Sequence, residues 1–444
     1  MDTSINDSRF FGEAPIGKIL LRIAPPVMLA QLIQALYNIV DSYFIGQYSE
    51  DGLTALSVIF PIQLIISALA VGTGVGVNTH MSRLYARRQD KEADRTAGAG
   101  MVLAIGTWLL FAVIAVLGME AYVRTSASAE AAVRNAVIYG RIVCAGSLFL
   151  FLESIWTKVH QARGNMRLPM IAQVVGAVVN IILDPLLIFG WGPFPALGIA
   201  GAAIATVTGQ LTAAAITAVG GIRRPPAFTA MMEYIRPIYR LGYPSILMQS
   251  LYTVYIAVLN MILAGFCDEA VTVLGLYYKM QSFFFIPLSG LQTCIVPVLS
   301  YNYATRSYDR CKAILRAALL ISGSFMTLGV LCFEFCPGWL ITLFSGSAKV
   351  LEIGIPAFRL IGLSFYSAVF SLIMPVYFQA VGEGGTSSLL SLTRQIFCLI
   401  PIFWVLSLIG LNWVWLAFPL SETIAGALGF YLYRRQTKAW ECSI

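Results

Sequence analysis

Charged residues are scarce in this chain. Lys, Arg, Asp and Glu make up 11% of its 444 residues, whereas they make up about a quarter of a typical soluble domain. Hydrophobic residues make up 58%, and the mean hydropathy is +0.78. This shortage of charge argues against a soluble protein and favours one that crosses a lipid bilayer several times as helices.

Histidine and paired cysteine are scarce as well. With only His80 and His160, a histidine metal site or an imidazole relay is not expected. Cys332 and Cys336 lie one helical turn apart, but no second pair completes a zinc site, so we interpret the cysteines as buried free thiols. The net charge of +7 gives no indication of a nucleic-acid partner, because the basic residues lie in alternate loops.

Long apolar runs predict an all-α polytopic membrane protein, because about 20 apolar residues suffice to cross a bilayer as a helix. The longest connection, 222–236, is predicted to be a cytoplasmic linker between an N-terminal lobe, 1–221, and a C-terminal lobe, 237–444. Each lobe holds six spans. The expected spans are 17–46, 52–81, 94–118, 130–160, 167–190, 197–220, 237–265, 270–301, 310–336, 350–381, 386–409 and 412–433.

The distribution of charge over the connections predicts the orientation. One set of connections is rich in Lys and Arg, and both terminal segments add to it. The opposite set holds mainly acids. By the positive-inside rule, both termini then lie in the cytoplasm. Examples from the basic set are Arg87, Arg163, Arg223 and Arg310, and examples from the acidic set are Glu120, Asp268 and Glu352.

The second half of the chain repeats the first at an offset of 218 residues, without gaps. Pro26 matches Pro244, and Tyr85 matches Tyr303. Because each half has six spans, both enter the membrane from the same side. We therefore expect two six-helix bundles related by a pseudo-two-fold axis along the membrane normal, as in alternating-access transporters.

A polar stripe marks the first span. Gln31, Gln34, Asn38 and Asp41 follow one another at helical spacing, so they share one side of the helix. A polar side of a membrane helix faces protein or a water-filled cavity rather than hydrocarbon.

A second acid, Asp184, is predicted to lie at the same depth as Asp41. Asn180 precedes it by one turn, and Pro185 loosens the helix directly after it. Thr206 of the sixth span can add a hydroxyl. Such oxygens suit a hard cation such as Na⁺, whereas burial and mutual repulsion would favour a shared proton. The alternative is that Asp41 reaches the external interface and Asp184 only caps a broken turn.

The repeat makes this site asymmetric, because Asp41 matches Leu259 and Asp184 matches Ile402 in the second half. Whatever these carboxylates do, the N-terminal lobe does alone. The residues expected to line a substrate cavity are Gln34, Tyr37, Asn38, Asn180 and Asp184.

Other polar residues inside spans have structural interpretations. Gly72 and Gly76 of the GTGVG segment favour close helix packing over phosphate binding. Glu153 is expected to take part in packing near the cytoplasmic end of the fourth span. In the second half, pairing within the bundle is expected of the intramembrane charges, with a substrate or proton site as the alternative. These charges are Lys279, Arg394 and Glu422.

Several segments resemble the multidrug and toxic compound extrusion (MATE) transporters over essentially the whole chain. They are NIVDSYFIGQYSEDGLTALSVIFPI, NIILDPLLIFG, YNYATRSYDR and PVYFQAVGEGG. The combination of Asp41 with Asn180 and Asp184 is similar to the DinF-like branch. That resemblance implies a cation site built from Asp41, Asn180, Asp184 and Thr206, with H⁺ or Na⁺ as the coupling ion. The acids of the NorM-like branch in the seventh and tenth helices are missing.

The resemblance implies cation-driven antiport that exports varied, often cationic and aromatic, drugs or toxins across the plasma membrane, the inner membrane in bacteria. We expect a monomer with no cofactor besides the coupling ion. A flippase for lipid-linked precursors is the alternative, although its pyrophosphate ligand would favour a cationic cleft. A membrane enzyme lacks a visible nucleophile with a base, and a channel lacks a filter.

Overall fold

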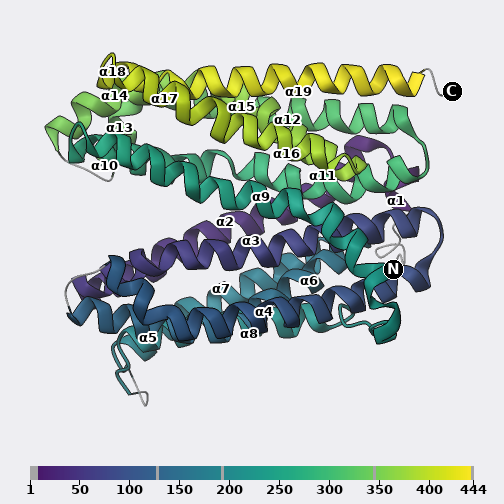
Figure 1. The fold of residues 1–444 in the computed structure, drawn as a ribbon, viewed down its shortest axis with the longest axis horizontal. Coiled ribbons are helices and arrows are strands. Elements are labelled where there is room, and N and C mark those ends of the chain that lie inside the picture. The colour runs from purple at the N-terminus through teal and green to yellow at the C-terminus, as the bar shows by residue number, and fades with distance from the viewer. Residues whose placement is uncertain (1–8, 127–129, 192–194, 344–346, 442–444) are drawn as a thin grey trace. The chain divides into compact units, whose positions relative to one another are not determined.

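The computed structural model describes residues 9–126, 130–191, 195–343 and 347–441, and these are helical almost throughout. Within these ranges, ten helices are long and apolar enough to cross a membrane, or twelve if each of two bent helix pairs is one span. Figure 1 shows the long helices that make up each part of the chain. The prediction of an all-helical protein with twelve spans is confirmed.

The chain divides into two compact units. The first comprises Met1–Ala14 and Leu21–Ile246, and the second comprises Pro15–Leu20 and Leu247–Ile444. The helices before the division are α1 (Phe10–Glu13), α2 (Ile16–Tyr48), α3 (Glu50–Ala86), α4 (Asp90–Ser126), α5 (Glu130–Gly146), α6 (Leu148–Ala162), α7 (Arg167–Ile188), α8 (Ile199–Ala218) and the short η2 (Phe228–Ala230). The division falls inside α9 (Met231–Ala264), so the last residues of the expected linker 222–236 are already helical.

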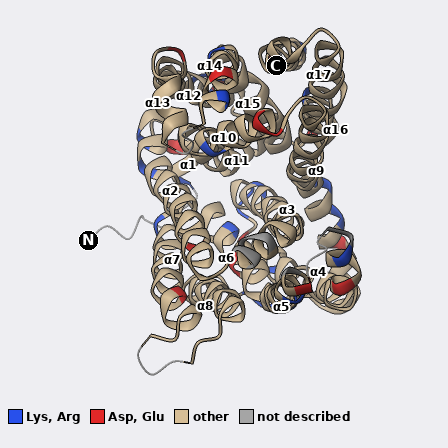
Figure 2. Cartoon of the chain, turned by 90° about the vertical axis from the view of Figure 1, so that its left-hand side faces the viewer, with Lys and Arg blue, Asp and Glu red and all other residues tan. Residues whose placement is uncertain are grey.

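The second unit continues with α10 (Asp268–Phe284), α11 (Ile286–Ala304), α12 (Tyr308–Phe335), α13 (Pro337–Thr342), α14 (Ala348–Gly362), α15 (Phe365–Val381), α16 (Gly384–Leu392), the π-helix η3 (Thr393–Leu399), α17 (Ile400–Ser407), α18 (Leu411–Val414) and α19 (Ala417–Glu441). Figure 2 shows how few charged residues colour these otherwise tan helices and those of the first unit.

Two spans expected to be continuous are broken. The span 270–301 bends by 54° between α10 and α11, and the span 350–381 bends by 56° between α14 and α15. At the first break, a proline in the first turn of α11 lacks the amide that would continue α10. At the second, Ser364 bonds back to the carbonyl of Ile361 at 2.6 Å and holds the turn.

The two halves of the repeat share an unusual backbone angle at equivalent positions. Among the described residues, Arg88 and Arg306 are the non-glycine residues with positive φ, 58° and 56°. They lie at equivalent positions of the repeat, just after α3 and α11, which end at the equivalent residues Ala86 and Ala304. The left-handed residue ends each helix at its last turn. The prediction of a repeat in this register is confirmed.

Glycines let α3 approach α9 closely. A Cβ atom on Gly76 would lie 2.1 Å from the carbonyl oxygen of Ile238, and one on Gly72 would lie 2.2 Å from a side-chain carbon of Ile246. Such distances are shorter than any real contact, so both positions require glycine. The interpretation of GTGVG as a packing motif is confirmed.

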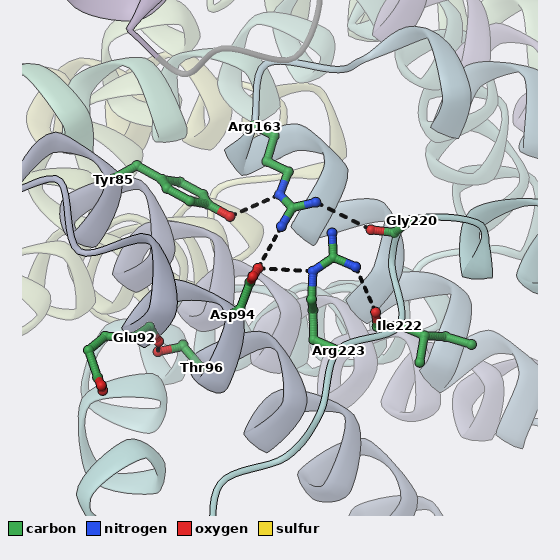
Figure 3. A network of polar contacts seen from close by, with 8 residues as sticks. All are labelled: Tyr85, Glu92, Asp94, Thr96, Arg163, Gly220, Ile222 and Arg223. Atoms are coloured by element: carbon green, nitrogen blue, oxygen red, sulfur yellow. Dashed lines mark hydrogen bonds and ion pairs between the residues drawn. The ribbon is translucent and has the colours of Figure 1, made fainter.

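A polar network in the first unit joins residues at the ends of α3, α4 and α6 to the segment that follows α8 (Figure 3). One oxygen of Asp94 accepts from Arg163 at 2.6 Å and from Arg223 at 2.9 Å. Arg163 also donates to the hydroxyl of Tyr85 at 2.9 Å and to the carbonyl of Gly220 at 3.4 Å. The network therefore holds the start of the connection to α9 against α3, α4 and α6.

Candidate cation and substrate site

The four residues predicted to bind a cation lie on three helices of the first unit, and all are buried. The exposed fractions are 7% for Asp41 on α2, 2% for Asn180 and 0% for Asp184 on α7, and 8% for Thr206 on α8. An ionised carboxylate in such a place needs a partner, because its burial is costly.

Tight packing of α7 on α8 brings Thr206 towards the acidic residue of α7. Gly176 and Gly209 meet there, and a Cβ atom on either would lie 2.7 Å from the other's carbonyl oxygen. The residue that follows Gly176 by one turn on the same face is Asn180. A Cβ on Gly209 would come within 3.1 Å of its Cβ. Glycine at both positions thus fixes the distance between the two polar helices.

The polar atoms of this site are only partly satisfied. Asn180 Nδ2 donates to Asp184 Oδ1 at 3.4 Å. The carboxylates of Asp184 and Asp41 are close enough to interact electrostatically. Each of the four site residues has one buried oxygen without a hydrogen-bond partner: Asp41 Oδ1, Asn180 Oδ1, Asp184 Oδ2 and Thr206 Oγ1. These hard oxygens form a ligand set that suits a small cation, and two neighbouring carboxyls can also share a proton.

Two tyrosine hydroxyls border the carboxylates. The hydroxyl of Tyr139 accepts from Gln63 Nε2 at 3.3 Å and also interacts with Thr206 and Asp41. The hydroxyl of Tyr37 accepts from Gln34 Nε2 at 3.4 Å and interacts electrostatically with both aspartates. The site is therefore surrounded by side chains that can reorient their donors when its charge changes.

A cavity of about 80 Å³ lies in the same unit, between α2, α6, α7 and α8. Of the residues expected to line a substrate cavity, Gln34, Tyr37 and Asn180 do line it. Asp184 and Asn38 are not among its lining residues, and the side chain of Asn38 is exposed. The full lining is Gln34, Tyr37, Leu150, Glu153, Gln173, Gly176, Ala177, Asn180, Thr206, Gly209, Gln210 and Ala213.

Three polar residues of this lining were missed as site residues. Gln173 lies 7 residues before Asn180, and Gln210 lies 4 residues after Thr206, so helical spacing alone could have placed each on the polar face of its helix. Glu153, expected to pack near the end of α6, is buried there and also lines the cavity. Sequence reasoning missed it because spacing does not say which helix a face meets.

The intramembrane charges of the second unit take two arrangements. Arg394, in the π-helix η3, lies 3.8 Å from Glu422 of α19, and Ser371 of α15 donates a hydrogen bond to the other oxygen of Glu422. The side chain of Lys279, on α10, is exposed. Arg394 and Glu422 thus connect three helical segments of the second unit.

Comparison with known proteins gives a consistent result. The sequence model of the MatE family matches residues 26–186 and again residues 244–405, which are the two halves of the repeat. The chain is 28% identical over 442 residues to the FAD transporter of Shewanella oneidensis, covering 95% of each chain. It is 23% identical over 440 residues to the multidrug export protein MepA of Staphylococcus saprophyticus, covering 96% of each.

Solved structures agree on the fold. An outward-facing multidrug resistance MATE family transporter of the MOP superfamily superposes with a TM-score of 0.91 at 23% identity, covering 99% of each chain. A MATE crystal structure in complex with MaL6 superposes with a TM-score of 0.90 at 22% identity. Family match, repeat and twelve-span fold together show that the chain is a multi-pass membrane transporter of the MATE family and not an enzyme.

Proposed function

We propose that this transporter is a cation-coupled antiporter that exports small organic molecules by alternating access. The observation that carries the proposal is the buried pair Asp41 and Asp184, each of which has one carboxylate oxygen without a donor. Such a pair is stable when it binds a cation and unstable when it is empty and doubly ionised. It can therefore make the energy of the first unit depend on ion binding.

The coupling ion is H⁺ or Na⁺, bound by Asp41 and Asp184. Asn180 and Thr206 complete the ligand set for Na⁺ in this proposal. Release of the ion leaves two carboxylates that repel each other, and this strain can bend α2 at its paired prolines, Pro25 and Pro26, inside the helix. That movement would change access to the cavity beside the pair, which is how ion flow and export are coupled in this scheme.

The positive-inside rule supports a plasma-membrane orientation with both termini in the cytoplasm. The end of the first unit that holds Arg163 and Arg223 would then face the cytoplasm. The carboxylates of Asp41 and Asp184 would lie nearer the outside. A monomer is sufficient for this mechanism, since all proposed ligands come from one unit of one chain.

Two substrate classes follow from the relatives. The MepA relatives are multidrug export proteins, and they favour drug-like compounds as the first candidate. The FAD transporter, 28% identical, favours an anionic flavin dinucleotide as a second candidate. A lipid-linked precursor is disfavoured by the acids of the first unit, because its pyrophosphate would meet carboxylates.

The test uses the full-length protein in liposomes, with a pH gradient and a Na⁺ gradient imposed separately and dye efflux measured. Asp41→Asn and Asp184→Asn should each lower gradient-driven efflux at least tenfold, because an amide cannot exchange a proton or balance a cation. Asp268→Asn, which changes an exposed acid in the first turn of α10, is the matched control. Wild-type rates in both site variants, or efflux that ignores both gradients, would contradict the proposal.

A further inference from the structure

A second cavity lies at the end of the first unit opposite the network of Arg163 and Arg223. It has a volume of about 470 Å³ and lies between the end of α2, the first turns of α5 and the start of α8. This volume falls within the range of small-ligand sites, about 300–1,000 Å³. Several of its lining residues are exposed, so a ligand can enter it from the surroundings. It shares no lining residue with the first cavity or with the proposed ion site.

The polar residues that line this cavity are donors, and no carboxylate is among its described lining residues. Arg134 and Asn135 on α5 both line it, and within the described part of the chain neither side chain has a hydrogen-bond or ion-pair partner. Ser49 Oγ accepts from the amide of Gly52 at 3.1 Å, so its own hydroxyl proton stays available to a ligand. The guanidinium group of Arg134 presents a planar fork of N–H groups that matches two oxygens of a phosphate. The cavity therefore suits an anion.

Apolar side chains continue from the cavity along α8. Ile138 and Leu197 line the cavity, and both are exposed. Farther along α8, Ile204 and Leu211 are exposed as well, and their spacing of seven residues places them on one face of the helix. Because α8 is a candidate membrane span, this apolar stripe runs from the cavity into the hydrocarbon region. The surface thus joins a polar cavity to an apolar path, as an amphiphilic ligand requires.

Aromatic rings beside the cavity indicate the level of the lipid headgroups. The ring of Tyr48, which lines the cavity, packs edge-on against Phe189 with ring centroids 6.3 Å apart. Phe189 in turn stacks on the exposed ring of Trp191 at 5.9 Å. Trp and Tyr gather at the membrane–water interface because their rings are apolar and carry one polar atom. The polar part of the cavity therefore lies where lipid phosphates are found.

A second arginine lies on the same face of α5. Arg141 follows Arg134 by seven residues, is exposed, and has no hydrogen-bond or ion-pair partner in the described ranges. It lies about 10 Å farther along the helix axis, within the candidate span Val133–Ala162. A charge at that depth is costly unless it reaches a polar group. Because Cα–Cβ bonds tilt toward the start of a helix, which is the cavity end of α5, its long side chain can extend toward the same phosphate layer.

The second half of the chain shows that the repeat does not require this arrangement. Arg134 matches Glu352 at the offset of 218 residues, and a carboxylate there would repel a phosphate. Arg141 matches Arg359, whose Nε donates to the carbonyl oxygen of Glu334 at 3.2 Å, so the equivalent arginine is bound within the protein. The packing that both halves share therefore does not account for the two arginines of α5.

We propose that this cavity binds the headgroup of a membrane phospholipid, with the phosphate held by Arg134 and Asn135 and an acyl chain lying along the exposed face of α8. Inorganic phosphate could use the same donors but would leave the apolar stripe uncovered. A lipid without phosphate would leave the guanidinium group without a counter-charge. The proposal concerns neither the coupling ion nor the exported compound, and it holds whichever leaflet lies at this end of the unit.

The test uses native mass spectrometry of the purified full-length protein, which is delipidated in detergent and titrated with dioleoylphosphatidylglycerol. The wild type should bind one lipid more tightly than the rest. Arg134→Gln should weaken this first binding step about tenfold, the order of effect expected when a charge-assisted bond to phosphate is lost. Arg134→Lys keeps the charge and should bind the first lipid more tightly than Arg134→Gln. Dioleoylglycerol, which has no phosphate, should bind the wild type and Arg134→Gln equally weakly.

Arg124→Gln is the matched control, because Arg124 is an exposed arginine at the same end of the unit that already pairs with Glu120 and Glu130. It should leave the first binding step unchanged, and size-exclusion chromatography checks that each variant is folded. An unchanged first step in Arg134→Gln, an equal loss in Arg124→Gln or in Arg134→Lys, or a wild type without a tight first step would each overturn the proposal. So would dioleoylglycerol that binds as tightly as the phospholipid, or inorganic phosphate that displaces the lipid at the same concentration.

Discussion

At the scale of single residues, the site combines side chains that have different chemical requirements. The carboxylates of Asp41 and Asp184 serve either a proton or a metal cation, whereas a hydroxyl such as that of Thr206 can coordinate only the cation. Thr206 is 8% exposed and lies on the helix packed against that of Asp184. It is therefore, with Asn180, one of the two proposed ligands whose loss would distinguish Na⁺ from H⁺ as the coupling ion.

We expect Thr206→Val to raise the Na⁺ concentration for half-maximal efflux by about tenfold if Na⁺ is the coupling ion, since about 1.4 kcal/mol corresponds to tenfold in affinity. Thr206→Ser, which keeps the hydroxyl, should behave as the wild type. If a proton is the coupling ion, the pH dependence of efflux should be the same in all three proteins. A rise in Thr206→Ser equal to that in Thr206→Val would show that the hydroxyl is not a ligand.

Sequence could predict those site residues whose partners lie on the same helix. Asn180 and Asp184 are one turn apart, and the structure does join them by a hydrogen bond. Helical periodicity also groups Gln34 with Asp41. Glu153 was not predicted to line the cavity, because its position there depends on which way α6 faces α7. A single sequence does not contain that information.

At the scale of elements, glycine contacts determine how closely the polar helices approach. The contact of Gly176 with Gly209 leaves no space for a methyl group. Sequence indicated the similar contact of Gly72 and Gly76, because these glycines are one turn apart. Gly176 and Gly209 lie on different helices, so no local pattern reveals their contact.

We expect Gly209→Ala to destabilise the protein by about 1–3 kcal/mol, the usual cost of overpacking, and to lower efflux by displacing Asn180. The matched control is Gly106→Ala in α4, where an added Cβ would meet nothing within 4 Å. That change should be neutral or slightly stabilising, because alanine favours helix more than glycine does. Thermal unfolding in detergent measures both. Equal unfolding temperatures for the two variants would show that α7 and α8 can move apart at no cost.

At the scale of the whole molecule, hydropathy and the repeat were sufficient to predict the fold class. A bilayer allows few structures, since every backbone group of a span must be bonded within it, and helices meet that requirement locally. The internal match at 218 residues is the same spacing at which the MatE family model matches twice. The breaks between α10 and α11 and between α14 and α15 were not predicted, because their flanking sequences remain as apolar as those of continuous helices.

The repeat also makes a prediction about topology that single residues can test. Arg87 and Thr305 are equivalent positions that follow α3 and α11. Because each half contributes six spans, both should lie on the cytoplasmic side, and Glu120 and Asp268 should lie outside. In a cysteine-free background, Arg87→Cys and Thr305→Cys should react with a membrane-impermeant maleimide in inverted vesicles, whereas Glu120→Cys and Asp268→Cys should react in intact cells. Labelling of Arg87→Cys and Thr305→Cys from opposite sides would mean an inverted repeat. Labelling of both from outside would mean that Asp41 and Asp184 lie nearer the cytoplasm than proposed.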